Sequence, residues 1–489
     1  MSKERFYITT TLPYVNAEPH IGFALEIVQA DVLARFARSQ GKEVFFNTGT
    51  DEHGLKIYRK AQEAGQESQA YVDEYAVKFD ELKTTLNVSY DHFIRTTAPQ
   101  HIKAAQEIWR RVATKGDIYK KNYKIKYCVG CELEKTDSDL ENGCCPIHPN
   151  QPIEIIEEEN YFFRFSKYQS KLLELYEKQP DFILPTKRLN EIKKFVAGGL
   201  ADFSISRLRA KMPWGVPVPD DAEHVMYVWF DALVSYISTL DWPENEDRFK
   251  QFWPGLQIAG KDNLRQQAAI WQAMLLSADL PSSKQILIHG FITSEGQKMS
   301  KSLGNVVSPK ALVDQFGVDP VRYFLLREIP SDEDGDFSLT RLKERYTSDL
   351  AHGLGNLVQR VSTLITDDLG GQFILSSPGT AVEEKIASVS RTVEVAIKNF
   401  RLHEALAQIW TLIDSANSLI SDRKPWEFKE ESEKFARALN DIVALIKATN
   451  DLLAPFIPET TEKIEKVFNF NQGAEIKVSK GKAIFPALE

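Results

Sequence analysis

The residues best suited to chemistry lie in a short loop near residue 300, where the sequence at 298–302 is KMSKS. An apolar run at 285–288 precedes it and is typical of a buried strand, and Gly296 allows a turn between the two. Lysines are mobile point charges for phosphate oxygens, and hydroxyl groups donate hydrogen bonds to them. The loop therefore suits a polyphosphate, although a solvated Lys/Ser loop is the ordinary interpretation of this motif alone.

A second candidate for phosphate chemistry lies near the N-terminus. Residues 6–11 are expected to form a strand. Apolar residues at helical spacing from Ile21 to Phe36 predict a helix that begins around His20 and is ended by Gly41. His20 and Gly22 then stand at a helix N-terminus, where free N–H groups and the helix dipole favour an anion. Neither GxxxxGK[ST] nor GxGxxG follows the strand, so the usual NTPase and NAD fingerprints are absent. A lone histidine is usually structural, and the lysine loop is what argues against that interpretation here.

The cysteines predict a metal site. All four lie within 18 residues, in the order Cys128, Cys131, Cys144 and Cys145, and His148 follows. Cys128-x-x-Cys131 and Cys145-x-x-His148 are two knuckles that supply a closed Cys₃His set, which suits one structural Zn²⁺. Cys144 is an alternative to Cys145, and four reduced free thiols are the other alternative. Such clustering favours a metal over disulfides in a chain without a signal-peptide pattern.

Composition limits the class of protein. A chain of 489 residues is too long for one core, and about two to four domains are expected. The sequence shows no apolar run of membrane-spanning length and no N-terminal leader pattern, so we expect a cytoplasmic enzyme without a membrane partner. The formal net charge is −9, which means that any nucleic-acid partner is held by local basic patches.

The elements that must position these residues alternate between strands and helices. Strands expected at 6–11 and 44–48 are each followed by a helix, which is the pattern of a parallel α/β sheet. The pattern resumes at 222–300 with strands at 225–230 and 256–260. After Pro320 it changes to long amphipathic helices, with apolar faces in 402–420 and 439–453 that predict a bundle. The α/β fold is therefore expected to be split by an insertion and followed by helices.

Two of these motifs together resemble a known family. Residues 19–22 (PHIG) and 298–302 (KMSKS) are similar to the two signatures of class I aminoacyl-tRNA synthetases. The insertion resembles that of the methionyl-tRNA synthetases of the single-zinc type, in residues 127–131 (YCVGC), 145–148 (CPIH) and 160–164 (NYFFR). Further matches are 11–14 (TLPY), 50–54 (TDEHG), 228–232 (VWFDA), 259–262 (AGKD) and 289–291 (HGF). The insertion is too short for the editing domain of relatives that activate valine, isoleucine or leucine.

The resemblance implies a fold and a domain order. The fold is α/β, a Rossmann-like catalytic domain with a parallel sheet, split by a zinc-binding connective insertion and followed by a helical anticodon-binding domain. The implied domains are catalytic residues 1–115, the insertion 116–221, catalytic residues 222–295, the lysine-loop region 296–345 and the anticodon-binding domain 346–489. In many relatives an appended C-terminal barrel drives dimerisation. We expect a monomer because this sequence shows none.

The resemblance also implies site residues. The implied catalytic residues are His20, Lys298 and Lys301. ATP, accompanied by Mg²⁺, is held by His20, Gly22, Glu26, Gly260, Asp262, Lys298, Ser300 and Lys301. Asp51 pairs with the substrate ammonium, and the amino-acid pocket comprises Leu12, Tyr14, Asp51, Trp229, Leu233, Tyr236, Asn263 and Gln267. The anticodon is read by Asn356, Arg360 and Trp426. Zn²⁺ is held by Cys128, Cys131, Cys145 and His148.

The implied activity is the ATP-dependent joining of L-methionine to tRNA(Met). Three positions depart from the family pattern. Phe23 stands where a second histidine is usual, and Asn263 and Gln267 stand where an apolar residue and a histidine are usual, so a more polar pocket wall is expected. The alternatives are an RNA-binding or regulatory paralogue that has lost its chemistry, and a small-molecule nucleotidyltransferase. The intact lysines and the helical region argue against them.

Overall fold

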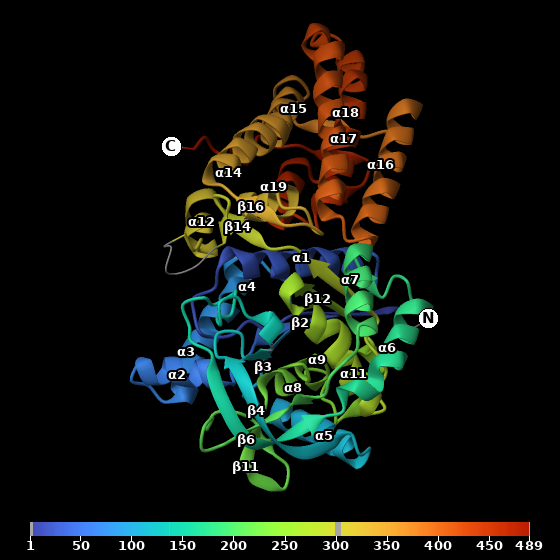
Figure 1. Ribbon diagram of the computed structural model, residues 1–489. Helices are drawn as coiled ribbons and strands as arrows, with labels where there is room; N and C mark the ends of the chain where they lie inside the picture. Colours follow the sequence, from blue (N-terminus) through green and yellow to red (C-terminus); the bar gives the residue numbers. More distant parts are fainter. Residues whose placement is uncertain (1–2, 136, 299–304, 489) are drawn as a thin grey trace. The chain divides into compact units, whose positions relative to one another are not determined.

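The computed structural model describes residues 3–135, 137–298 and 305–488 (Figure 1). The chain forms two compact units. The first unit comprises Met1–Pro19, Ala37–Leu82 and Ser89–Ile288, and the second comprises His20–Phe36, Lys83–Val88 and His289–Glu489. Among the described residues, no helix has both the length and the apolar character needed to cross a bilayer. The domain limits expected from the sequence stay a prediction.

The first unit is built on a six-stranded sheet within the described residues, in the order β3-β2-β1-β12-β13-β7. β1 pairs in parallel with both β2 and β12, β2 pairs in parallel with β3, and β13 with β7. The expected parallel α/β fold is confirmed, and its strands come from two halves of the chain. The strands are β1 (Arg5–Thr10), β2 (Glu43–Thr50), β3 (His92–Arg95), β7 (Ile183–Leu184), β12 (Leu256–Gly260) and β13 (Gln285–His289).

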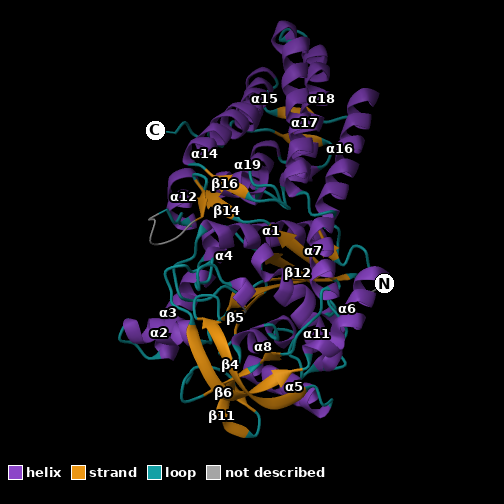
Figure 2. Cartoon of the chain, viewed as in Figure 1, coloured by secondary structure: helices purple, strands orange, loops and turns teal. Residues whose placement is uncertain are grey.

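The insertion between these halves is a mostly antiparallel region. Its longest strands, β4 (Ile118–Cys128) and β6 (Glu154–Phe163), pair over ten positions and stand out in Figure 2. The sheet order is β5-β4-β6-β8, with β5 at Leu133–Lys135 and β8 at Phe203–Ser204. The insertion also supplies β7, an edge strand of the parallel sheet that the sequence did not indicate. A third sheet has the order β10-β11-β9, at Pro217–Val218, Asp221–Met226 and Ser206–Leu208.

One expected element of the first unit is wrong in part. The strand expected at 225–230 ends with β11 at Met226, and Val228–Ala232 forms the short helix α8. The N–H groups of Phe230 and Asp231 both donate to the Tyr227 carbonyl oxygen, at 2.9 and 3.2 Å, which closes a helical turn. Burial on both sides explains the error, because periodicity does not separate a buried strand from a buried helical turn.

The helices of the first unit flank these sheets and enclose one apolar core that includes Trp109, Phe163 and Trp271. They are α2 (Leu55–Glu63), α3 (Ser68–Asp80), α5 (Pro99–Thr114), α6 (Gln169–Lys178), α7 (Thr186–Ala197), α9 (Ser235–Ser238), α10 (Glu246–Phe252) and α11 (Trp271–Ser277). Two further helices, α1 (Ile21–Ser39) and α4 (Leu82–Thr85), have residues in both units.

The second unit is mainly helical, as expected. The long helices α16, α17 and α18 run side by side in Figure 1. The apolar face expected in α17 is fully buried, from Leu402 to Ile420. The helices are α12 (Pro309–Phe316), α13 (Val318–Arg327), α14 (Leu339–Arg345), α15 (Asn356–Asp368), α16 (Thr380–Lys398), α17 (Leu402–Arg423), α18 (Ser432–Leu453) and α19 (Pro458–Phe468).

Short strands complete this unit. β14 (Ile292–Ser294) lies between β15 (Gln297–Lys298) and β16 (Gly335–Phe337), and β17 (Gln372–Ile374) pairs with β18 (Glu475–Lys477). The C-terminal segment packs against the π-helical stretch that contains Tyr346. The Phe485 ring lies 6.0 Å from the Tyr346 ring, whose hydroxyl donates to the Pro486 carbonyl oxygen.

Candidate functional site

The carboxyl ends of β1, β2 and β12 place several predicted residues at one edge of the parallel sheet. The strand order reverses direction between β1 and β12, and ligands of open α/β sheets bind outside the carboxyl ends at such a switch point. The residues that follow these strand ends include Leu12 and Tyr14 after β1, Asp51 after β2, and Asp262 and Asn263 after Gly260 at the end of β12.

Asp51 is the most unusual of these residues because its carboxylate is 2% exposed. Its backbone is fixed by the N–H of Asp51, which donates to Pro13 O at 3.0 Å, and by the N–H of Val15, which donates to Asp51 O at 3.3 Å. The side chain accepts a hydrogen bond from the backbone N–H of His53. Its Oδ1 atom is buried without a partner among the described residues. Buried polar atoms are normally paired, so this oxygen is available to a ligand.

The charge state of Asp51 follows from its surroundings. Burial raises the pKa of this carboxyl well above its usual range, and the nearby carboxylates of Asp231 and Glu132 raise it further. A cation placed at Oδ1 reverses both effects, because it pairs with the ionised form. The position therefore suits a bound ammonium group.

Aromatic rings lie beside this carboxylate. Tyr14 pairs with Asp51 as a short parallel bridge, and its ring meets Trp229 edge to face, with centroids 6.3 Å apart. The Tyr14 hydroxyl and Trp229 Nε1 are buried without partners in the described part of the chain. Rings of this kind pack well against a thioether.

The polar wall expected from Gln267 is present but internally satisfied. Gln267 is fully buried, its Nε2 donates to the Tyr236 hydroxyl at 2.5 Å, and its Oε1 accepts from Gln257 Nε2 at 3.2 Å. These bonds fix the ring of Tyr236, which belongs to the predicted pocket. Of the remaining predicted pocket residues, Leu233 is buried and Leu12 and Asn263 are half-buried.

The segment after Asp51 is held by a residue that sequence analysis missed. Glu132 is fully buried, and its Oε1 accepts the N–H of Lys56 at 2.7 Å, which caps the first turn of α2. A Cβ atom at Gly54, where φ is +108°, would lie 2.8 Å from the same oxygen. Only glycine fits this position without strain. Glu132 follows Cys131 directly, so the insertion supports the loop that holds Asp51.

A buried His–Asp–His cluster also lies in the first unit and was not predicted. Both oxygens of Asp231 contact an imidazole nitrogen at 2.6 Å, one from His53 and one from His101. His53 belongs to the TDEHG motif and Asp231 to the VWFDA motif, so their motif positions were the available signal. Nothing in the sequence marks His101.

The four predicted metal ligands come together in the insertion. The ligand atoms of Cys128, Cys131, Cys145 and His148 all lie within 4.8 Å of one another. His148 Nδ1 is 3.2 Å from the Cys131 sulfur and 3.8 Å from the Cys128 sulfur, and the Cys131 and Cys145 sulfurs are 3.5 Å apart. Ligands at tetrahedral Zn²⁺ distances are about 3.7 Å apart. The four residues therefore fit one metal ion.

The predicted phosphate-binding residues near the N-terminus belong to the second unit. The N–H of Gly22 donates to His20 Nδ1 at 3.1 Å, which assigns the remaining ring proton to Nε2. Desolvation of the ring lowers the His20 pKa. A Cβ atom at Gly22 would lie 2.9 Å from the His20 ring, so glycine permits this arrangement.

The four other predicted ATP residues in this unit differ in how much of each the structure describes. Glu26 is buried, and its Oε2 lies 2.8 Å from Nε2 of His289, the histidine of the HGF motif. Lys298 ends β15, and its backbone pairs with Thr293. Ser300 and Lys301 lie outside the described residues.

The three predicted anticodon residues lie in the helical part of the second unit. Asn356 begins α15 directly after a π-helical stretch, Tyr346–Gly355, and Arg360 follows one turn later. Trp426 lies in a short 3₁₀ turn after α17 and is 40% exposed. Tryptophan is usually largely buried, so this degree of exposure is uncommon. The Trp426 ring is accessible for stacking on an unpaired base.

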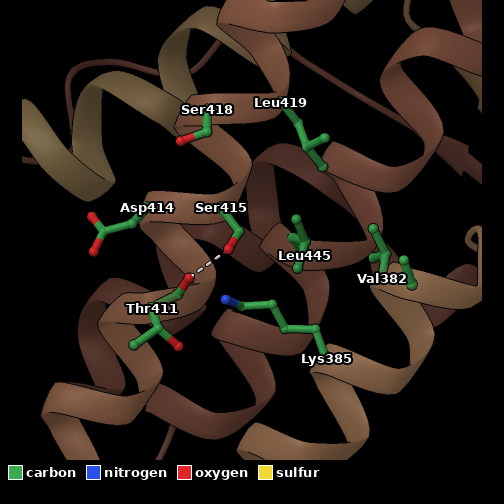
Figure 3. Close-up of a pocket in the computed structure, with 9 residues that line it drawn as sticks. Val382, Lys385, Thr411, Asp414, Ser415, Ser418, Leu419 and Leu445 are labelled. Carbon is green, nitrogen blue, oxygen red and sulfur yellow. Dashed lines mark hydrogen bonds between the residues drawn. The ribbon is translucent and has the colours of Figure 1, made fainter.

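The same unit has a shallow hollow of about 430 Å³ between α16, α17 and α18 (Figure 3). Lys385 reaches into it, and the Ser415 hydroxyl donates to Thr411 O at 2.8 Å. None of the residues predicted to read an anticodon is among the described residues that line this hollow.

Comparisons with known proteins agree with these features. The family model described as tRNA synthetases class I (M) matches residues 6–151 and 130–362, and the model described as anticodon-binding domain of tRNA ligase matches 380–485. Methionine–tRNA ligases from Thermotoga maritima and Mesorhizobium japonicum are 42% and 41% identical, over 96% and 95% of this chain and 76% and 91% of theirs.

The fold is also similar to solved structures. Mycobacterium tuberculosis methionyl-tRNA synthetase in complex with methionyl-adenylate matches with a TM-score of 0.94 and 37% identity, over 99% of this chain and 100% of that one. Its apo form matches with a TM-score of 0.86, over 99% and 98% of the two chains. On these matches and on the two family models, this chain belongs to the class I tRNA synthetases, in the family of the methionine–tRNA ligases.

Proposed function

We propose that this protein is a methionine–tRNA ligase. It activates L-methionine with ATP to form methionyl-adenylate and pyrophosphate, and then transfers methionine to tRNA(Met). The observation that supports this most strongly is the buried Asp51 carboxylate beside the Tyr14–Trp229 pair, with one oxygen that has no partner among the described residues. This arrangement offers an ammonium site and an aromatic surface for a thioether within one pocket.

Activation joins a methionine carboxylate oxygen to the α-phosphorus of ATP and breaks its bond to the bridging oxygen of pyrophosphate. The protein's task is positioning and charge stabilisation. Asp51 holds the ammonium, while Leu12, Tyr14, Trp229, Leu233, Tyr236, Asn263 and Gln267 surround the rest of the amino acid. His20 donates from Nε2 to phosphate, Lys298 and Lys301 neutralise the departing pyrophosphate, and the Ser300 hydroxyl donates a hydrogen bond to it.

Two of the remaining ATP residues contact the nucleoside, and two shape the protein backbone that surrounds the nucleotide. Gly260 ends β12 and Asp262 follows it, and both are assigned to the nucleoside, with the Asp262 carboxylate on the ribose. Gly22 permits close approach of the nucleotide, and Glu26 stabilises the same region through its contact with His289. Mg²⁺, when bound with ATP, shields the phosphate charge. Since translation takes place in the cytoplasm, we place the enzyme there.

The pKa of Asp51 predicts how methionine binding depends on pH. Below the raised pKa of Asp51 the free carboxyl is neutral, and it must lose a proton before it pairs with an ammonium ion. KM for methionine should therefore rise as pH falls through this pKa, while KM for ATP follows a different profile. ATP–pyrophosphate exchange from pH 5.5 to 8.5 measures both. A methionine KM that stays constant over this range would show that Asp51 is ionised throughout.

We assign the metal as one structural Zn²⁺ held by Cys128, Cys131, Cys145 and His148. Cys144 is not part of this cluster. Cys145→Ser should therefore reduce zinc from about one equivalent to a small fraction and lower the melting temperature, because structural zinc binding contributes directly to folding. The matched Cys144→Ser variant should keep both values near wild type. Metal analysis by mass spectrometry decides between Cys145 and Cys144 as the ligand. If Cys144→Ser is the variant that loses zinc, Cys144 is the ligand and the assignment of Cys145 is wrong.

The transfer step requires recognition of tRNA, which we assign to Asn356, Arg360 and Trp426. Arg360→Ala should raise KM for tRNA(Met) in aminoacylation by about tenfold, because one contact to an unpaired base is lost. ATP–pyrophosphate exchange without tRNA should be unchanged. The exposed residue Arg437 on α18 provides a matched control as Arg437→Ala. If Arg360→Ala leaves KM for tRNA unchanged, this assignment is wrong.

A further inference from the structure

The His–Asp–His cluster of the first unit has no role in the mechanism so far. Asp231 is fully buried, His101 is fully buried, and His53 is nearly so. His53 Nδ1 and His101 Nε2 each lie 2.6 Å from a different oxygen of the Asp231 carboxylate. The other nitrogen of His101 lies 3.0 Å from the Ser238 hydroxyl oxygen. Both oxygens of Asp231 and both nitrogens of His101 are therefore paired within the protein.

The cluster joins three elements at the amino-acid pocket. His53 lies in the loop after β2, two residues beyond Asp51, and its backbone N–H donates to the Asp51 carboxylate. Asp231 lies in α8, two residues beyond Trp229, and His101 lies in α5. A continuous chain of contacts thus runs from the Asp51 carboxylate through His53 to Asp231 and His101. The same loop is also held by Trp214, whose Nε1 donates to Glu52 O at 2.5 Å and whose ring lies 5.6 Å from the His53 ring.

The cluster also carries charge close to Asp51. Burial alone would raise the pKa of Asp231, but His53 and His101 outweigh it through charge and hydrogen bonds and hold the pKa at about 2. Asp231 is thus ionised, and its negative charge is felt at Asp51. The buried charge of Asp231 next to the Asp51 carboxylate, which has no cation beside it in the described residues, opposes folding. The same charge favours a cation that binds at Asp51, because preorganised charge in a water-poor site acts strongly.

We propose that His53, Asp231 and His101 form a positioning cluster for the substrate ammonium group: they hold the Asp51 loop against the helix of Trp229 and add a fixed negative charge behind Asp51. The proposal rests on the assignment of methionine as substrate. We assign none of the three side chains to the reacting atoms, and their action runs through Asp51. Their effect is therefore expected in the binding of the ammonium end, and not in the chemical step or in ATP binding.

The test is Asp231→Asn, which keeps the shape of the side chain and removes its charge. KM for methionine in ATP–pyrophosphate exchange should rise about tenfold, since small displacements of a binding group have large effects. Changes in kcat and in KM for ATP should stay within about threefold. Methioninol retains the ammonium group, and its inhibition constant should rise in parallel with KM for methionine. The inhibition constant of 4-(methylthio)butanoate, which lacks the ammonium group, should stay within about twofold.

The matched control is Asp117→Asn. Asp117 is also a fully buried carboxylate of the first unit, but its partners are Lys167, Tyr168 and Ser277. This variant should keep KM for methionine near wild type even where its melting temperature falls. Should Asp231→Asn fail to fold, His101→Gln is measured instead. It should raise KM for methionine and the inhibition constant of methioninol by about threefold each.

An unchanged KM for methionine in a folded Asp231→Asn variant overturns the proposal, and so does equal weakening of both inhibitors. Equal weakening would mean that the cluster supports the whole pocket and not its ammonium end. Failure of the wild-type enzyme to catalyse methionine-dependent exchange is a separate result, because it removes the assigned substrate. The two failures are therefore distinguishable in one series of assays.

Discussion

Asp51→Asn should lower kcat/KM for methionine by about three orders of magnitude. Loss of one member of a buried, hydrogen-bonded charge pair costs about 2–5 kcal/mol, and 4 kcal/mol corresponds to about a thousandfold. The expected loss lies in this range because the ammonium would face an amide in a pocket where Asp51 is 2% exposed. Asparagine has nearly the same shape, so the change removes charge and little else. ATP–pyrophosphate exchange at varied methionine concentration gives the value.

The same variant should not lose stability. Asp51 Oδ1 is buried and has no hydrogen-bond partner in the described part of the chain. The Asp51 carboxylate also lies near the carboxylates of Asp231 and Glu132, so its charge opposes folding. The melting temperature of Asp51→Asn should equal or exceed that of the wild type. A kcat/KM loss below tenfold, or a loss that accompanies a clear drop in melting temperature, would contradict the role given to Asp51.

Lys301→Ala should lower the rate of adenylate formation by about a thousandfold. Removal of one uncharged donor to a developing negative charge costs about 10²–10³ in rate, and an ammonium group facing pyrophosphate should reach the upper end. Affinity for tRNA(Met) should stay within about twofold, because the lysine acts on the nucleotide. Single-turnover adenylate formation and tRNA binding by filter retention separate the two effects.

A nearby lysine provides the control for this prediction. Lys310 lies on α12, is exposed, and pairs with Asp314 one turn away. Lys310→Ala should leave adenylate formation unchanged. If Lys301→Ala weakens tRNA binding and adenylate formation equally, the lysine acts on the RNA and the assignment of the loop to ATP is wrong.

Hydrophobic patterning predicted much of the fold. The strands β1, β2 and β12 are short apolar runs between turn residues, and α17 and α18 have strong helical periodicity, so these elements were visible in the sequence. Among the elements that were not visible are β7 and α8. β7 has two residues and depends on its pairing with β13, a contact between distant parts of the chain. α8 is an apolar run buried on all sides, and the local pattern of such a run does not favour a helix over a strand.

The candidate site also contains residues that the sequence predicted and residues that it did not. Cysteine spacing predicted which four side chains come together, because the two knuckles are local motifs. The roles of Asp51 and Trp229 were expected only through resemblance to a family. His101 had no signal because its role depends on α5 meeting α8, which no local pattern predicts. Glu132 was missed because a glutamate that caps a distant helix has the same sequence appearance as a surface residue.

The most direct measurement is ATP–pyrophosphate exchange by the purified protein with each of the twenty amino acids, without tRNA. We predict exchange that depends on methionine, with weak exchange for close analogues at most. Exchange with no amino acid would contradict the account and favour an RNA-binding paralogue in which Phe23 accompanies lost chemistry. Exchange that depends on a different amino acid would contradict the substrate assignment and make Asn263 and Gln267 the first residues to test.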